Sequence, residues 1–453
     1  MLTLAYVSYC PTMQSPPPRP RVFYGWWIVA AGFLNQAFAA ALLQRAFGSY
    51  SVLLRQEFGW SKTELAAAAS MQQLENGMLG PLQGWFVDRF GPRLSMRLGV
   101  AAFGIGFLLF SRVQTLSQFY AAFLLMALGS NFGGFFPLSV ATVNWFNKKR
   151  SRALSILQMG MALGGLLIVV VVWALEAFGW RQVAFVSGIL VLVVGLPVTQ
   201  VVRRRPEDHG MHVDGEAPEA ASTTAEGGTR ARRADEGPEF TLRQAMATPA
   251  FWLISLGHAS ALLIVVALNQ HLSLYITEDL GYSLVFAGTI QTILTASQLV
   301  GIALSGVAGD RWDKRWIAVG CMLCHTAGLL LLAHTSSTLL LSTGATVHGV
   351  AWGLRGPLMN GIRADYFGRK SFGAILGVSS LLVTVGTIFG PLFAGFLADR
   401  TGSYELGFTI LAILSGVGSI FFVIARRPAA PLPPPTAGSD GAAEAGEASA
   451  SGA

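Results

Sequence analysis

The sequence predicts an all-α membrane protein with twelve transmembrane helices arranged as two six-helix repeats. Three observations predict this fold class. Hydrophobic residues make up 53% of the chain and charged residues only 12%, against about 25% charged residues in soluble domains. Twelve apolar runs reach roughly the 20 residues that a membrane-spanning helix needs. Motifs of the first half recur in the second half at an offset near 310 − 88 = 222 residues.

The first six predicted helices are apolar runs separated by charged or proline-containing turns. Ser61 and Glu64 have capping-box spacing at the start of the second helix. Pro92 lies at the start of the third helix, where a missing backbone N–H is tolerated. These six helices span 24–47, 62–87, 94–112, 117–145, 152–178 and 182–202.

The last six predicted helices begin and end near prolines, Pro249 and Pro428. They span 250–277, 284–308, 316–334, 338–363, 371–398 and 404–425. A polar segment rich in Glu, Gly, Thr and Arg precedes them. The chain therefore divides into an N-terminal bundle at 22–202, a cytoplasmic linker at 203–244 and a C-terminal bundle at 245–427. We expect disordered tails at 1–21 and 428–453, because Pro- and Gly-rich sequences bury little apolar surface.

The distribution of Lys and Arg predicts that both termini lie in the cytoplasm, because cytoplasmic loops carry an excess of these residues. With the N-terminus inside, most basic residues lie in inner loops, and the outer loops hold only Arg55, Lys62, Arg112, Arg181 and Arg400. We therefore expect a multi-pass protein of the cell membrane, with membrane lipid as its surroundings. The net charge of +7 comes from these basic residues in the loops between apolar runs. We therefore attribute it to membrane topology and expect no nucleic-acid partner.

The two halves repeat at several positions in the same order. GWS at 59–61 matches GYS at 281–283, and WFNKKRSRAL at 145–154 matches YFGRKSFGAI at 366–375. Gln44-Arg45 of the first helix matches Gln270-His271 of the seventh. Two parallel six-helix repeats are an architecture of secondary transporters.

A charged loop follows the second helix of each repeat, GWFVDRFGPR at 84–93 and GVAGDRWDKR at 306–315. Asp88 and Asp310 lie at helix C-termini, where a carboxylate is unfavourable unless positive charge surrounds it. We expect these loops to form a conformational latch between the bundles, or else to be solvated loops that fix the topology. The cations expected to surround the two carboxylates are Arg89, Arg93, Arg311 and Arg315.

These loops resemble the Gly-x-x-x-Asp-Arg-x-Gly-x-Arg/Lys signature of the major facilitator superfamily, although Asp313 replaces the usual glycine in the second copy. The resemblance covers roughly residues 22–427. FYGWWIV at 23–29, WFNKKRSRALSILQMGMALGG at 145–165 and RRRPEDHGMHVDG at 203–215 are similar to the monocarboxylate-transporter and oxalate/formate-antiporter group. One departure is that the eighth helix has no charge before Asp310, whereas several monocarboxylate carriers have an Asp and an Arg there.

The resemblance implies the major facilitator fold, in which helices 1, 4, 7 and 10 line a central cavity. It also implies that Arg45 matches a basic residue of the first helix that contacts substrate. A planar guanidinium suits a carboxylate, and the alternative is a side chain that reaches the bilayer surface. Arg355 lies near the bilayer centre by its place in the tenth helix. We expect it to contact substrate, or else to form a buried ion pair with Glu75.

Three further residues in predicted helices are candidates, because polar and ionisable groups are costly in hydrocarbon. His271 can change charge near neutral pH, and we expect it to bind substrate and couple a proton, or to be structural. Glu75 is expected to carry a proton or to act as a counter-ion. Asn131, followed by two glycines and Pro137, is expected to give the fourth helix a kink and a polar contact with substrate, or to aid helix packing.

The motif CMLCH at 321–325 has the spacing typical of c-type haem attachment, but it falls inside the predicted ninth helix. No phosphate-binding loop, zinc spacing or nucleophile motif is found in the sequence. We therefore expect no cofactor, no metal and no enzymatic activity.

The sequence predicts a secondary transporter of small organic anions, mono- or dicarboxylates, that works by alternating access and is coupled to a proton or a counter-anion. It is expected to function as a monomer. One alternative is an exporter of drug-like or amphipathic metabolites. An alternative of another class is a membrane sensor that has the same fold and transports nothing.

Overall fold

The computed structural model describes residues 22–216 and 239–430. The predicted N-terminal tail, the middle of the linker and the C-terminal tail from residue 431 lie outside the described residues. Within those two ranges the chain is helical and contains no strand. The predicted all-α fold class is confirmed.

The N-terminal half, residues 24–201, contains six helical segments of membrane-spanning length, three of which are divided by short irregularities. The elements η1 and η2 are π-helical turns within such segments. In order, the elements are α1 (Tyr24–Ala39), η1 (Ala40–Arg45), α2 (Phe47–Phe58), α3 (Lys62–Phe90), α4 (Pro92–Phe110), α5 (Leu116–Gly133), α6 (Phe135–Trp145), α7 (Arg150–Phe178), α8 (Trp180–Leu190), η2 (Val191–Gly195) and α9 (Leu196–Val201).

The C-terminal half, residues 249–424, contains six further segments. Before it, the described part of the linker forms only η3 (Glu207–His209), η4 (Val213–Gly215) and α11 (Leu242–Met246). The elements of the half are α12 (Pro249–Leu274), η5 (Tyr275–Asp279), α13 (Leu284–Arg311), α14 (Lys314–Ala333), α15 (Thr338–Phe367), α16 (Phe372–Thr401) and α17 (Glu405–Ile424).

Ten of these segments are long and apolar enough to cross a membrane. The other two, α3 and α15, have 29 and 30 residues but carry more polar side chains. The predicted first helix was too short, because the structure continues it through α2 to Phe58. Gln56 and Glu57 are exposed there, while Tyr50 and Leu54 are buried, so this extension is amphipathic rather than apolar throughout.

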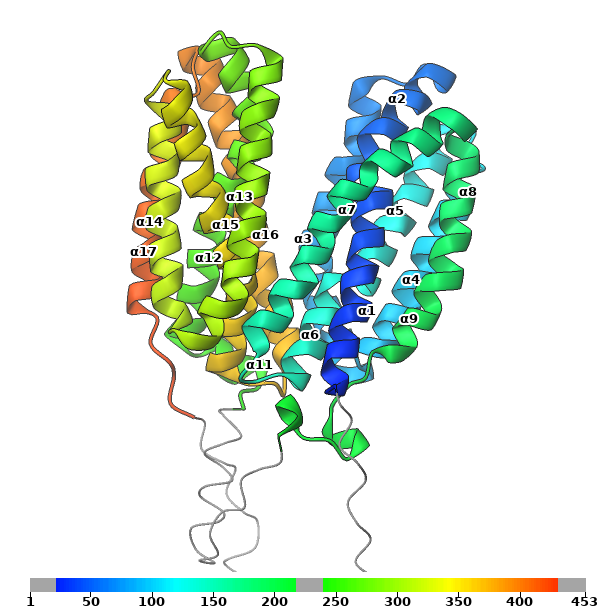
Figure 1. The fold of residues 1–453 in the computed structure, drawn as a ribbon, viewed down its shortest axis with the longest axis vertical. Coiled ribbons are helices and arrows are strands. Elements are labelled where there is room, and N and C mark those ends of the chain that lie inside the picture. The colour runs from blue at the N-terminus through cyan, green and yellow to red at the C-terminus, as the bar shows by residue number, and fades with distance from the viewer. Residues whose placement is uncertain (1–21, 217–238, 431–453) are drawn as a thin grey trace, which may run out of the picture.

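The two halves lie side by side and meet at one end (Figure 1). They approach each other at the end where α1 begins and α17 ends, and they diverge toward the opposite end. The contacts between halves are made chiefly by α3 with α16 and by α7 with α13. We call the end at which the halves meet the closed end.

Glycines allow the backbones of α3 and α16 to approach each other closely. A Cβ atom added at Gly84 would lie 2.2 Å from the carbonyl oxygen of Gly373, and one at Gly80 would lie 2.8 Å from that of Gly377. Small residues at helix contacts are typical of membrane proteins, because close packing drives association there.

Candidate functional site

The fourth membrane-spanning segment is broken at Gly134, between α5 and α6. Side chains from other helices donate hydrogen bonds to the backbone carbonyl groups at this break. This satisfies backbone groups that would be costly in a bilayer. The contacts are Gln83 Nε2 to the oxygen of Asn131, Ser95 Oγ to that of Phe132 at 2.8 Å and Asn35 Nδ2 to that of Gly133 at 2.8 Å.

Asn131 lies just before this break and joins α5 to α3. Its side-chain amide donates to Asn76 Oδ1 at 2.6 Å. Glu75 is the neighbouring residue on α3, and neither of its carboxylate oxygens has a hydrogen-bond partner among the described residues. Glu75 and Arg355 form no ion pair in the described part of the chain. The structure therefore does not contain the buried Glu75–Arg355 pair that was the alternative for Arg355.

Arg45 is the last residue of the π-helical η1 and is exposed. None of the described side chains forms an ion pair or hydrogen bond with it. Gly165 of α7 lies beside it, since a Cβ atom added there would lie 3.7 Å from Arg45 Nε. Single π-helical turns are rare and often occur at functional sites, and the sequence carries no signal for this one.

His271 of α12 is half-buried and contacts α16. Its Nε2 lies 3.0 Å from the carbonyl oxygen of Pro391, and its ring centroid lies 5.0 Å from that of Tyr404. Because a carbonyl oxygen only accepts, Nε2 carries the proton in this contact. Arg45 and His271 are counterparts in the sequence repeat, but His271 is held within its own half while Arg45 is exposed.

Arg355 of α15 is fully buried, and its Nε, Nη1 and Nη2 atoms have no partner among the described residues. It lies on the helix face that also carries His348, which approaches Gly328 of α14. The next residue, Gly356, faces Gln158 of α7 instead. Arg355 therefore points into the C-terminal half, and the structure does not bring it together with Arg45.

The two predicted latch carboxylates make equivalent contacts across the closed end. Asp88 Oδ1 and Oδ2 accept from the backbone N–H groups of Gly373 and Ala374 at 3.0 Å and 2.7 Å. Asp310 Oδ1 accepts from that of Ser151 at 2.8 Å. The offsets 310 − 88 and 373 − 151 are both 222. Each carboxylate thus lies at the N-terminus of a helix of the other half, where the helix dipole favours negative charge.

The four arginines that were expected to surround these carboxylates are directed elsewhere. Arg93 Nε donates to the oxygen of Val202 at 2.6 Å, and Arg315 Nη2 donates to that of Val423 at 2.9 Å. Arg89 lies over the ring of Trp85, and Arg311 is exposed. Backbone N–H groups of the opposite half bind both carboxylates, and Arg152 Nε of the N-terminal half also lies 3.9 Å from Asp310 Oδ2.

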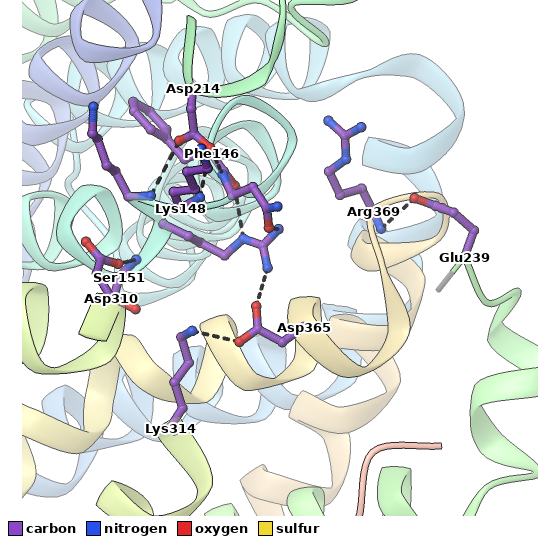
Figure 2. Close-up of polar contacts among 12 residues, drawn as sticks. Phe146, Lys148, Ser151, Asp214, Glu239, Asp310, Lys314, Asp365 and Arg369 are labelled. Atoms are coloured by element: carbon purple, nitrogen blue, oxygen red, sulfur yellow. Dashed lines mark hydrogen bonds and ion pairs between the residues drawn. The ribbon is translucent and has the colours of Figure 1, made fainter. Parts of the chain in front are cut away.

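An ion pair that the sequence did not predict, between Arg150 of the N-terminal half and Asp365 of the C-terminal half, also joins the halves, and Lys314 of the C-terminal half binds the same carboxylate (Figure 2). Asp365 of α15 accepts from Arg150 Nη1 at 2.6 Å and from Lys314 Nζ at 2.7 Å. Arg369 Nη1 donates to the oxygen of Asn144 at 2.6 Å. The repeated basic motif at 145–154 and 366–375 was the signal that marked this region, but it did not identify Asp365 as the shared acceptor.

Carboxylates of the linker bind the two loops of this repeated motif at equivalent positions (Figure 2). Asp214 Oδ2 accepts from the backbone N–H of Lys148 at 2.8 Å, and Oδ1 from that of Lys149 at 3.4 Å. Glu239 accepts from the backbone N–H groups of Arg369 and Lys370 at 3.2 Å and 2.6 Å. Both offsets, 369 − 148 and 370 − 149, equal 221. The two described ends of the linker therefore bind the two halves at the closed end, and Glu207 of the first end also pairs with Arg369 of the C-terminal half at 3.2 Å.

Comparisons with known proteins agree with this architecture. The family model described as Major Facilitator Superfamily matches residues 32–291 and 254–452. The membrane sensor protein UhpC of Escherichia coli is 23% identical over 80% of this chain and 83% of its own. Monocarboxylate transporter 13 of Rattus norvegicus is 25% identical, and the match covers 87% of this chain and 88% of the rat protein. The crystal structure of the human organic anion transporter MFSD10 covers 90% of this chain and 100% of its own with a TM-score of 0.66 at 14% identity. The chain belongs to the Major Facilitator Superfamily.

Proposed function

We propose that this protein is a secondary transporter of small organic anions, mono- or dicarboxylates, that works by alternating access. The observation that carries the proposal is Arg45, an exposed and unpartnered cation within the first membrane-spanning segment of the described chain. A charge at such a position is costly unless it meets water or a ligand of opposite charge. A guanidinium binds carboxylates in a planar, bidentate geometry.

Two similar proteins support this class of substrate. The rat protein is named as a monocarboxylate transporter, and the human structure is that of an organic anion transporter. These names describe the two similar proteins. They favour an anionic substrate here because Arg45 carries the opposite charge.

We assign Arg45 as the principal anion-binding residue, with Asn131 as a polar contact near the break in the fourth segment. In this conformation Arg355 is enclosed by its own half and out of reach of a ligand between the halves. Glu75 and His271 are our candidates for coupling a proton, and exchange against a counter-anion is the other form of coupling that fits. The carboxylate of Glu75 supports coupling to a proton, because no described residue hydrogen-bonds to either of its oxygens.

We further propose that the closed end faces the cytoplasm. Loops at that end contain the basic residues Lys148, Lys149, Arg369 and Lys370, as expected for cytoplasmic loops. The conformation described here is then open toward the outside, and the contacts of Asp88, Asp310 and Asp365 form the inner gate.

Uptake by the purified protein in liposomes tests the proposal. Counterflow of labelled carboxylates is expected to exceed that of cations and neutral sugars. Arg45→Gln should lower kcat/KM for the preferred anion at least tenfold, which corresponds to roughly 1.4 kcal/mol. Arg55→Gln is the matched control, because Arg55 is an exposed arginine of the adjacent α2. Near-native KM in the Arg45→Gln variant would remove the basis of the anion site.

A sensor is the second candidate, and the similarity to UhpC favours it specifically. A sensor binds its ligand but carries nothing across. Saturable binding of a carboxylate to the purified protein, together with no flux of that compound in sealed liposomes, would support the sensor over the transporter.

A further inference from the structure

Three arginines lie close together at the closed end of the N-terminal half, where α4 begins and α9 ends (Figure 1). We call Arg93, Arg97 and Arg203 the arginine triad. Arg93 Nε donates to the oxygen of Val202 at 2.6 Å, and Arg97 Nη2 donates to Gln200 Oε1. Arg97 and Arg203 both lie within electrostatic range of Arg93. The triad therefore lies along the seam between α4 and α9.

The triad brings three positive charges together without a carboxylate partner among the described residues. Other basic side chains at this end do have one, since Lys148, Arg150 and Lys314 each form an ion pair. The triad side chains are half-buried. Five of their six Nη atoms donate to no described residue, and none of these five is buried. Their outer nitrogens are therefore open to the surroundings and can meet a ligand.

Apolar and aromatic side chains flank the triad. Leu94 and Leu98, which follow Arg93 and Arg97 in the sequence, are 38% and 52% exposed. The Arg203 guanidinium lies 4.3 Å from the ring centre of Tyr24, the first residue of α1. Basic and aromatic side chains together are typical of the level at which lipid headgroups meet hydrocarbon.

An apolar crevice of about 320 Å³ lies deeper in the same seam, between α1, α4 and the segment from α8 to α9. Val198 and Leu190 line it, and they precede Arg203 by 203 − 198 = 5 and 203 − 190 = 13 residues. At a rise of 1.5 Å per residue, the crevice lies roughly 8–20 Å deeper than the triad. The hydrocarbon of one leaflet is about 15 Å thick, so this is the depth of an acyl chain.

The seam faces the bilayer and not the space between the halves. In Figure 1, α4, α8 and α9 form the side of the N-terminal half that is directed away from the C-terminal half. Leu190 of the crevice is 37% exposed, so the crevice opens at this outer surface. A molecule of the bilayer can therefore reach the triad and the crevice together.

We propose that this seam binds one anionic phospholipid from the leaflet at the closed end, with its phosphate at the arginine triad and an acyl chain along the crevice. Guanidinium groups bind phosphate oxygens through charge-assisted hydrogen bonds, and basic pockets between membrane helices bind anionic headgroups. A soluble phosphate would use the triad alone, whereas a phospholipid uses both parts of the seam. The site lies outside the space between the halves, so the inference does not rest on the proposed transport activity.

Lipid binding to the purified full-length protein in detergent tests the inference. Dioleoyl phosphatidylglycerol and dioleoyl phosphatidylcholine have the same acyl chains and differ in net charge, and native mass spectrometry counts the bound molecules. We expect one tight site, with at least tenfold higher affinity for phosphatidylglycerol. Glycerol 3-phosphate, which has the phosphate but no acyl chain, should not displace the lipid at equal concentration. Equal affinities for the two lipids, or displacement by glycerol 3-phosphate, would overturn the proposal.

A pair of double variants locates the headgroup. Each basic residue beside an anionic lipid contributes about fivefold in affinity, so Arg97→Gln with Arg203→Gln should weaken phosphatidylglycerol binding at least tenfold. Arg426→Gln with Arg427→Gln is the matched control, because these two exposed arginines follow α17 at the same end of the protein. Its affinity should stay within twofold of the wild type. Equal losses in both double variants would indicate general surface charge and overturn the site.

Val198→Phe tests the acyl-chain part of the site separately. The larger side chain fills part of the crevice and leaves all three arginines in place. We expect at least fivefold weaker binding of dioleoyl phosphatidylglycerol, with a Tm in lipid-free detergent equal to that of the wild type. Wild-type affinity in Val198→Phe would place the chains elsewhere and overturn the assignment. This variant and the comparison of lipids on the wild-type protein decide the question even where the arginine variants do not fold.

Discussion

At the scale of single residues, Asp88 and Asp310 show how far the sequence could define the contact between the halves. The repeat marked both carboxylates, and their helix-terminal positions indicated a need for compensation. Their partners could not be predicted, because backbone N–H groups of Gly373 and Ser151 belong to the opposite half. Sequence proximity instead favoured the neighbouring arginines. Arg355 illustrates a second limit, since position along a helix gives depth but not the direction in which a side chain points.

We predict that Asp88→Asn changes transport much more than substrate binding. The amide keeps one acceptor for α16 but loses the charge and the second acceptor, and hydrogen bonds to a charged group contribute about 1.5–3 kcal/mol. The closed end then opens more readily, and flux falls because the conformational equilibrium is displaced. Flux in liposomes and equilibrium binding are measured on the same preparation. Asp208→Asn, an exposed change in the linker, is the control, and a parallel loss of binding and flux would indicate misfolding instead.

At the scale of elements, the hydropathy pattern predicted the order of the long helical segments, ten of which are apolar enough to cross a membrane in the described part of the chain. The break of the fourth segment was indicated by Gly133, Gly134 and Pro137. The extension through α2 was missed, because an amphipathic end of a helix resembles a loop when only hydropathy is considered. Pairing of elements was also beyond the sequence, although Gly84 and Gly306, at the offset 306 − 84 = 222, lie at the two contacts between the halves.

We predict that Gly84→Ala shifts the conformational equilibrium away from closure at this end. The added methyl would lie 2.2 Å from the backbone oxygen of Gly373, and a backbone atom cannot move aside as a flexible side chain can. Spin labels on α3 and α16 near the closed end should report a longer mean distance and more of the separated population. Gly288→Ala in α13 is the control, because no atom lies within 4 Å of its added Cβ. An unchanged distance distribution in Gly84→Ala would show that this contact does not determine closure.

At the scale of the whole molecule, the linker joins the two halves through carboxylates at both of its described ends. Asp214 binds the loop of Lys148, and Glu239 binds the equivalent loop of Arg369. Glu216 also pairs with Lys148, and this contact lowers the pKa of the Glu216 carboxyl below its usual range. Composition alone indicates a polar linker. Its folded ends could not be predicted, because their partners are backbone groups that every residue carries.

The orientation of the whole molecule leads to a prediction about labelling. If the closed end is cytoplasmic, Lys149 lies inside, and Glu278 of η5 lies toward the outer side. Single cysteines are placed at positions 149 and 230, expected inside, and at 62 and 278, expected outside. An impermeant maleimide applied to intact cells should modify only positions 62 and 278, and all four after permeabilisation. The basic residues of the inner loops cause this orientation, since they resist translocation. Labelling of position 149 or 230 in intact cells would reverse the assignment, and the conformation described here would then be open toward the cytoplasm.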